Sequence, residues 1–189
     1  MMRRHTPNLL TLARIALLPI LVLINYLPVH WSPLATTGVF ILAALTDWLD
    51  GYLARRWSLV SDFGAFLDPV ADKLMVSTAL ILVLQHNPAV WVVLPVLVII
   101  GREITISALR EWMAGLGAGA QVAVSRIGKI KTTAQMMAII CLLYQHNFAG
   151  LPTYIIGITL LYLAVALTLW SMLIYLQAAW PELRGSAGS

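Results

Sequence analysis

The sequence contains almost no cysteine and few charged residues. Its single cysteine, Cys141, excludes an intrachain disulfide and lies inside an apolar segment, where packing is its expected role. Charged residues make up 11% of the chain, against about 25% in ordinary soluble domains. Together with a hydrophobic content of 60%, this composition indicates an integral membrane protein.

The N-terminus lacks the marks of a removable secretory signal. Two early arginines precede an apolar run, but that run is too long for a signal core and no small-residue cleavage site follows it. Internal repeats, low-complexity tracts and a second domain are also missing. We therefore expect one membrane domain over residues 1–184, followed by a linker-like tail, GSAGS, at residues 185–189.

Six apolar segments are long enough, or nearly so, to cross a bilayer. A spanning helix requires roughly 20 mostly apolar residues. The expected helices cover residues 8–27, 34–56, 68–86, 89–114, 126–146 and 151–179. The predicted fold class is therefore an all-α integral membrane protein with six transmembrane helices.

Charge is missing from three of the connections between these helices. PVHWSP, QHNPAVW and QHNFAGLP contain no Lys, Arg, Asp or Glu, and all twelve Lys and Arg residues fall elsewhere. Because basic residues concentrate in cytoplasmic loops, both termini are predicted to lie in the cytoplasm. Trp31 and Trp91 would then lie at the outer interface, either as an aromatic belt or through plain packing.

One stretch, residues 46–73, holds five aspartates in this apolar background. Asp47 and Asp50 are three residues apart near the cytoplasmic end of one predicted helix. Asp68 and Asp72 are four residues apart at the start of the next. Either spacing places its two carboxylates on one helix face, and a hairpin would bring all four to one depth. A carboxylate within a spanning helix costs about 2.5–3.5 kcal/mol on insertion scales, so this placement predicts a function.

Four converging carboxylates cannot all remain ionised without bound cations. The available ligands are oxygens, and no His or Cys lies near the motif to favour zinc. The pattern therefore favours hard divalent ions such as Mg²⁺, Mn²⁺ or Ca²⁺. A pair of such ions, bridged by carboxylates, would hold phosphoryl oxygens.

Single residues of this stretch also have plain structural explanations. Asp68 before Pro69 is typical of a helix N-cap and first turn, and Asp62 is expected to be a solvated loop residue. Gly51 and Ala54 are compatible with tight helix packing as well as with close approach of a ligand. Simple ion pairing or membrane topology would account equally for Lys73, Arg55 and Arg56.

The spacing of the acidic stretch is specific. Written out, it is Asp47-x2-Asp50-Gly51-x2-Ala54-Arg55-x8-Gly64-x3-Asp68-x3-Asp72, and it resembles in full the signature of the CDP-alcohol phosphatidyltransferase family. PNLLTLARI, GREITISALREWMA and SRIGKIKTTAQM are similar to the bacterial branch that uses sn-glycerol 3-phosphate as acceptor. Together these stretches extend the resemblance over nearly the whole chain.

The resemblance implies a membrane enzyme, usually a homodimer, that transfers the phosphatidyl group of CDP-diacylglycerol to sn-glycerol 3-phosphate and releases CMP. The implied ligands of two divalent cations, Mg²⁺ or Mn²⁺, are Asp47, Asp50, Asp68 and Asp72, with Asp72 also the catalytic base. The implied nucleotide and diphosphate contacts are Asp47, Gly51, Ala54, Arg55 and Asp68. Its partners would be the two substrates and membrane lipids, with no nucleic acid.

The location of the acidic stretch fits such a reaction. A site slightly inside the cytoplasmic face of the bacterial inner membrane lets a lipid donor enter sideways from the bilayer. The nucleotide product and the soluble acceptor would exchange with the cytoplasm.

Basic residues of the fourth and fifth predicted helices are candidates for binding the acceptor phosphate. The planar guanidinium of arginine suits phosphate because it can donate two hydrogen bonds at once. The candidates are Arg102, Arg110, Arg126, Lys129 and Lys131, with Arg110, Arg126 and Lys131 preferred. Positive-inside topology or anionic-lipid contact explains each of them equally well. Glu103 and Glu111 are expected to pair with neighbouring arginines, and Asn8 and Arg14 to reach the nucleotide or the metal-ligand shell.

Three other functions stay open on the sequence alone. A relative in the same family would use inositol phosphate, serine or phosphatidylglycerol as acceptor. A membrane prenyltransferase also holds magnesium diphosphate on aspartates, although its two acidic motifs normally lie in separate parts of a longer chain. A cation transporter would carry a carboxylate midway across the membrane, whereas the acids of this chain lie towards one side.

Overall fold

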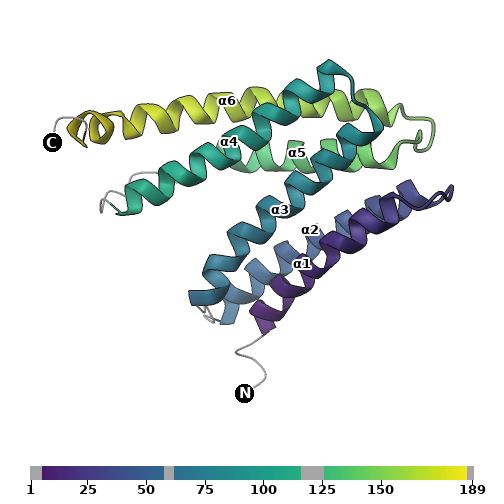
Figure 1. Cartoon of the computed structure of the whole chain (residues 1–189), viewed down its shortest axis with the longest axis horizontal. Coiled ribbons are helices and arrows are strands. Elements are labelled where there is room, and N and C mark those ends of the chain that lie inside the picture. Colours follow the sequence, from purple (N-terminus) through teal and green to yellow (C-terminus); the bar gives the residue numbers. More distant parts are fainter. Residues whose placement is uncertain (1–5, 58–61, 116–125, 187–189) are drawn as a thin grey trace. The chain divides into compact units, whose positions relative to one another are not determined.

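The structure is a computed structural model that describes residues 6–57, 62–115 and 126–186. Within these ranges the chain forms six α-helices, labelled in Figure 1. They are α1 (Thr6–Asn25), α2 (Ser32–Trp57), α3 (Asp62–His86), α4 (Val90–Gly115), α5 (Arg126–Tyr144) and α6 (Thr153–Ser186). The prediction of an all-helical chain with six helices is confirmed.

Helix α3 begins earlier than the sequence suggested. It starts at Asp62, so Asp62 is not a loop residue and Asp68 is not the N-cap. Pro69 lies inside the helix, where it removes a single backbone hydrogen bond, a loss that membrane helices tolerate. An acidic residue at the first position is favoured by the helix dipole, and the apolar residues after it extend the helix. Asp68 and Asp72 therefore lie within a continuous helix rather than at its first turn.

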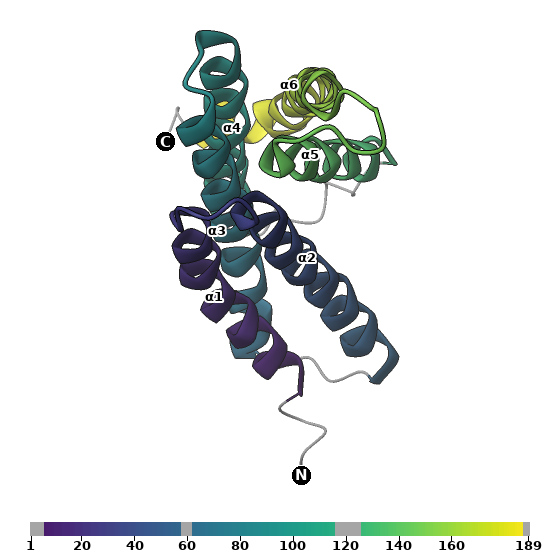
Figure 2. The same ribbon diagram turned by 90° about the vertical axis from the view of Figure 1, so that its right-hand side faces the viewer.

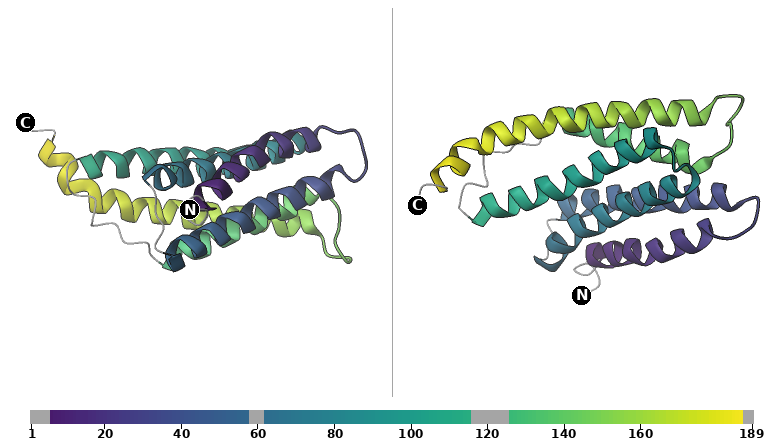
Figure 3. Two further views of the ribbon diagram at one scale, coloured as in Figure 1. Left: turned by 90° about the horizontal axis from the view of Figure 1, so that it is seen from below. Right: turned by 45° about the horizontal axis from the view of Figure 1, so that its top comes forward.

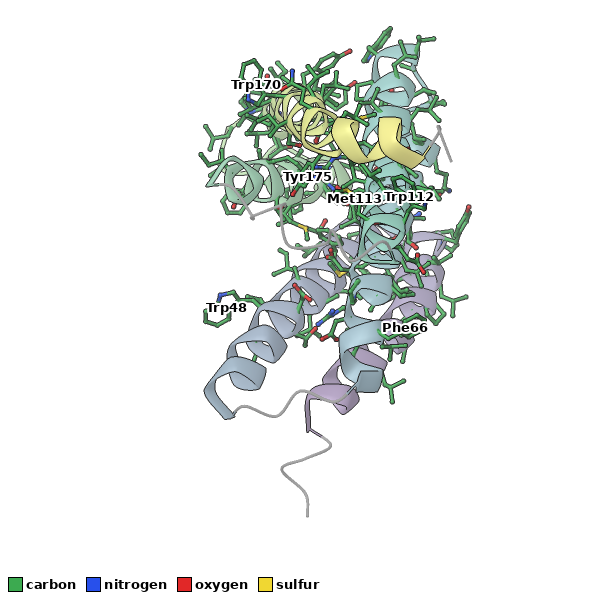
Figure 4. All side chains as sticks on the ribbon, turned by 90° about the vertical axis from the view of Figure 1, so that its left-hand side faces the viewer. Trp48, Phe66, Trp112, Met113, Trp170 and Tyr175 are labelled. Atoms are coloured by element: carbon green, nitrogen blue, oxygen red, sulfur yellow. The ribbon has the colours of Figure 1, made fainter. Side chains whose placement is uncertain are left out.

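The helices are apolar enough for a multi-pass membrane protein. Three of them contain stretches that are long and hydrophobic enough to cross a bilayer: Ser32–Leu49, Val90–Met113 and Thr153–Gln177. Shorter apolar stretches cover Thr11–Asn25 and Ile130–Tyr144. Large apolar side chains are widely exposed, among them Trp48 and Trp170, which project from α2 and α6 in Figure 4. In a membrane protein such side chains are expected to face lipid.

The chain divides into two compact units. One contains residues 1–87 and 139–154, and the other contains residues 88–138 and 155–189. Buried side chains of the first unit include Phe40 and Met75, and those of the second include Val92. The single domain expected over residues 1–184 stays a prediction. Helix α6 continues to Ser186, into the expected tail, and residues 187–189 lie outside the described part of the chain.

Helix α1 is the central contact of the first unit. It packs along both α2 and α3, and these two helices contact each other much less (Figure 2). A short connection joins α1 to α2, so that they form an antiparallel hairpin (Figure 3). Ser32 Oγ at the start of α2 donates a 2.7 Å hydrogen bond to the carbonyl oxygen of Ile24, and closes this turn. The acidic residues of α2 and α3 are therefore brought together through α1.

Candidate functional site

Asp47 of α2 forms an ion pair with Arg14 of α1. The Nη1 atom of Arg14 lies 2.7 Å from Oδ1 of Asp47. The Arg14 side chain is only 1% exposed, whereas that of Asp47 is 42% exposed. A guanidinium withdrawn from water requires a partner, so Arg14 restrains one oxygen of a carboxylate that otherwise faces outward.

Asp68 of α3 is held by another residue of α1, Thr11. Thr11 Oγ1 donates a 2.5 Å hydrogen bond to Oδ1 of Asp68, and Thr11 is completely buried. Phe66, two residues before Asp68, is 68% exposed and points away from the unit in Figure 4. Residues two apart lie on nearly opposite sides of a helix, which accounts for the inward direction of Asp68.

Asp72 lies one turn beyond Asp68 on α3 and is half-buried. Its spacing of four residues places it on the same helix face as Asp68. Among the side chains that the structure describes, no three His, Cys, Asp or Glu residues come close enough to hold a metal ion. Asp50, the remaining member of the predicted ligand set, has a side chain outside that description.

The surroundings of several other predicted site residues also lie outside the described part of the structure. In α2 these are Gly51, Ala54 and Arg55. In the remaining helices they are Asn8, Arg110, Arg126 and Lys129. Their assignments stay predictions.

The second unit contains a buried ionic cluster on α4 and α5. Lys131 Nζ and Arg102 Nη1 lie 2.5 Å and 3.1 Å from the same atom, Oε1 of Glu103. The side chains of Lys131 and Arg102 are 8% and 9% exposed. One carboxylate therefore holds two cations, and the three groups together keep a net positive charge.

Helix α6 completes this cluster through Arg102. Arg102 Nη2 donates a 2.9 Å hydrogen bond to Oγ of Ser171, and its guanidinium carbon lies 5.7 Å from the centre of the Tyr175 ring. Tyr175 projects from α6 in Figure 4. The contacts of Arg102 are thus divided among a carboxylate, a hydroxyl and an aromatic face, which fixes its orientation.

The expected pairing of Glu103 with a neighbouring arginine is confirmed, but its contact with Lys131 was not anticipated. The net charge of the cluster is compatible with binding an anion. The same contacts also tie three helices together, so geometry alone does not assign Arg102 and Lys131 to the acceptor phosphate.

Comparison with known proteins identifies the family. The family model for CDP-alcohol phosphatidyltransferase matches residues 4–170. The chain belongs to the CDP-alcohol phosphatidyltransferase family. This membership argues against the prenyltransferase and cation-transporter hypotheses.

Two bacterial members of the CDP-alcohol phosphatidyltransferase family are close relatives. They come from Shigella flexneri serotype 5b (strain 8401) and Escherichia coli strain K12, and both are called CDP-diacylglycerol–glycerol-3-phosphate 3-phosphatidyltransferase. Each is 55% identical to this chain over 182 residues, which is 96% of this chain and 98% of the relative. The similarity therefore extends far beyond the acidic signature.

Thr11, which contacts the acidic site, was missed by the sequence analysis. It carries no charge, and a buried threonine in an apolar helix is ordinarily explained by packing. The available signal was its position three residues before Arg14, which places both side chains on one face of the helix. In this member of the CDP-alcohol phosphatidyltransferase family, that face of α1 contacts two residues of the acidic signature.

Proposed function

We propose that this protein transfers the phosphatidyl group of CDP-diacylglycerol to sn-glycerol 3-phosphate, producing phosphatidylglycerophosphate and CMP. The observation that carries this proposal is the 55% identity, over almost the full length of both chains, to two proteins that bear the name of this activity. The contacts of Asp47 and Asp68 with one helix add support, because they gather part of the acidic signature in one unit.

The proposed site binds two divalent cations, Mg²⁺ or Mn²⁺, through Asp47, Asp50, Asp68 and Asp72. The donors are all carboxylate oxygens, which suit hard cations. Arg14 and Thr11 each contact one oxygen of Asp47 and Asp68, and these carboxylates would hold the cations together with Asp50 and Asp72. When bound, such cations would offset the negative charge that develops on the departing CMP phosphate.

The transfer step is a direct displacement. The hydroxyl oxygen of the acceptor attacks the phosphorus that carries diacylglycerol, and the bond from that phosphorus to the CMP oxygen breaks. Asp72 accepts the hydroxyl proton, since an alcohol is a poor nucleophile until a base removes that proton. A single displacement inverts the configuration at phosphorus. No covalent enzyme intermediate is required.

The nucleotide roles follow the family signature, and the acceptor roles follow the cluster of basic residues on α4 and α5. Gly51, Ala54 and Arg55 are assigned to the cytidine nucleotide and diphosphate, together with Asp47 and Asp68. The acceptor phosphate is assigned to Arg110, Arg126 and Lys131, with Arg102 and Lys129 as further candidates. A pocket of fixed cations attracts a dianion because its donors are already oriented when the ligand arrives.

The proposed location is the bacterial inner membrane, with both termini and the acidic site on the cytoplasmic side. The charge distribution supports this orientation, since three connections between helices lack Lys, Arg, Asp and Glu. The proposed assembly, a homodimer, follows the family resemblance alone. A site at that interface gives access to a membrane-bound donor and a soluble acceptor.

A competition among acceptors tests the proposed substrate. The purified protein in detergent, with Mg²⁺ and CDP-diacylglycerol, is offered equal amounts of sn-glycerol 3-phosphate, inositol phosphate, serine and phosphatidylglycerol. Mass spectrometry of the lipid product should find phosphatidylglycerophosphate as the dominant species. Preferential formation of another phospholipid would be consistent with the family assignment but would show that the proposed acceptor is wrong.

A further inference from the structure

Thr11 and Arg14 form a pair on one face of α1, and each contacts an acidic residue of a different helix. We propose that they are positioning residues, which fix the carboxylates of Asp68 and Asp47 in the orientation that a divalent cation requires. This inference rests on the proposed function, since it assumes that these carboxylates coordinate a cation.

The two contacts have the same geometry, with one donor on one carboxylate oxygen. Arg14 Nη1 lies 2.7 Å from Oδ1 of Asp47, and Thr11 Oγ1 lies 2.5 Å from Oδ1 of Asp68. One helix face therefore reaches α2 and α3 at the same level of the unit. In both cases the contact restrains one carboxylate oxygen.

Both donors on α1 are buried. Thr11 and Arg14 are both 0% exposed, so neither can exchange its partner for water without moving the helix. By contrast, the Asp47 side chain is 42% exposed and would adopt several rotamers without a restraint. A buried donor that fixes an accessible carboxylate is the arrangement by which outer contacts orient metal ligands.

Helix α1 is also fixed against α3 at its opposite end. Asn25 Nδ2 donates a 2.9 Å hydrogen bond to Oε1 of Gln85, which links the end of α1 to the end of α3. The contacts Thr11–Asp68 and Asn25–Gln85 both run forward in sequence, so α1 and α3 are parallel and joined near both ends. The donors on α1 therefore have a defined register.

The test measures Mn²⁺ binding as well as turnover. Thr11→Val removes the hydroxyl with almost no change in shape, and Thr11→Ser keeps the donor. The matched control is Thr37→Val, because Thr37 is also buried and its hydroxyl bonds only locally, to the carbonyl oxygen of Pro33 at 2.8 Å. Mn²⁺ is titrated into each purified variant in detergent, and free Mn²⁺ is read by electron paramagnetic resonance.

Thr11→Val should bind Mn²⁺ roughly 10–100-fold more weakly than the wild type, which is the usual effect of removing an outer contact to a metal ligand. Thr11→Ser and Thr37→Val should bind it as the wild type does. Arg14→Lys, which keeps the charge but not the planar fork, should also weaken binding. Turnover at saturating Mn²⁺ should recover in Thr11→Val, because the defect is in metal affinity.

Two contrary outcomes have different meanings. Wild-type Mn²⁺ affinity in Thr11→Val, with thermal stability lowered as in Thr37→Val, would overturn the positioning role and leave the proposed function intact. If the wild type itself bound no Mn²⁺ while turnover persisted with chelator, both the proposed metal site and the positioning role would be wrong.

Discussion

At the scale of single residues, the buried cations of the two units have different partners. Arg14 is buried against a carboxylate that remains partly exposed, whereas Lys131 and Arg102 share one oxygen of Glu103. The first arrangement leaves a carboxylate available to a ligand. The second holds two cations in place and links α4, α5 and α6.

Replacing Asp72 by asparagine should abolish most of the transfer activity. Loss of a general base costs about 10²–10⁴-fold in rate, and loss of a metal ligand adds to this. The measurement is CMP release by the purified variant at saturating substrates. Asp62→Asn is the matched control, since Asp62 is on the same helix but outside the family signature. Undiminished turnover in Asp72→Asn would remove it as the base.

Replacing Lys131 by glutamine should raise the KM for sn-glycerol 3-phosphate more than the KM for the lipid donor, because its assigned partner is the acceptor phosphate. The single change also leaves Glu103 with one cation fewer, which lowers stability. The double variant Glu103→Gln/Lys131→Gln also removes the carboxylate that pairs with the buried Arg102, so its thermal stability should fall further while the acceptor KM stays high. A normal acceptor KM in the double variant would mean that Lys131 acts only on stability.

Sequence reasoning identified the charged residues more readily than their partners. Asp47, Asp68, Arg102 and Lys131 were visible because a charge in an apolar helix requires an explanation. Thr11 and Ser171 were not, since their roles come from a neighbour that is distant in the sequence, 57 residues away for Thr11 and 69 for Ser171. Such pairings depend on how helices pack, and no local pattern encodes them.

At the scale of helices, it was easier to predict that a helix exists than to predict where it begins and ends. All six helices follow from apolar segments of sufficient length, but α3 starts at Asp62 rather than near residue 68. Pro69 suggested a helix start because proline is favoured there, yet it is accommodated inside the helix. The sequence predicted that Arg14 of α1 reaches the nucleotide or the metal-ligand shell, and Arg14 pairs with Asp47. It did not predict that α1 packs along both α2 and α3, because the acidic motif itself suggested a simple hairpin of those two.

The register of α1 against α3 predicts a coupling between Asn25 and Gln85. In a double-mutant cycle with alanine at either or both positions, the coupling free energy should be about 0.5–1.5 kcal/mol, typical of a hydrogen bond between membrane helices. Unfolding of each variant in detergent measures this quantity. Additive effects of the two changes would show that the hydrogen bond contributes nothing to the packing of α1 on α3.

At the scale of the whole molecule, the charge distribution predicts the orientation in the membrane. Cys141 can be replaced by serine to give a chain without cysteine, into which one cysteine is introduced at Val29 or at Ser189. A membrane-impermeant maleimide added to intact bacterial cells should label position 29 and not position 189. The reverse pattern would place the acidic site on the outer side, away from a cytoplasmic acceptor.

We expect the acidic stretch to catalyse phosphatidyl transfer from CDP-diacylglycerol to sn-glycerol 3-phosphate with divalent cations. CMP release by the purified protein, measured with and without Mg²⁺ and with and without the acceptor, tests this expectation. Release should occur only when CDP-diacylglycerol, Mg²⁺ and sn-glycerol 3-phosphate are all present. Release that continued in a chelator, or that did not require the acceptor, would contradict it.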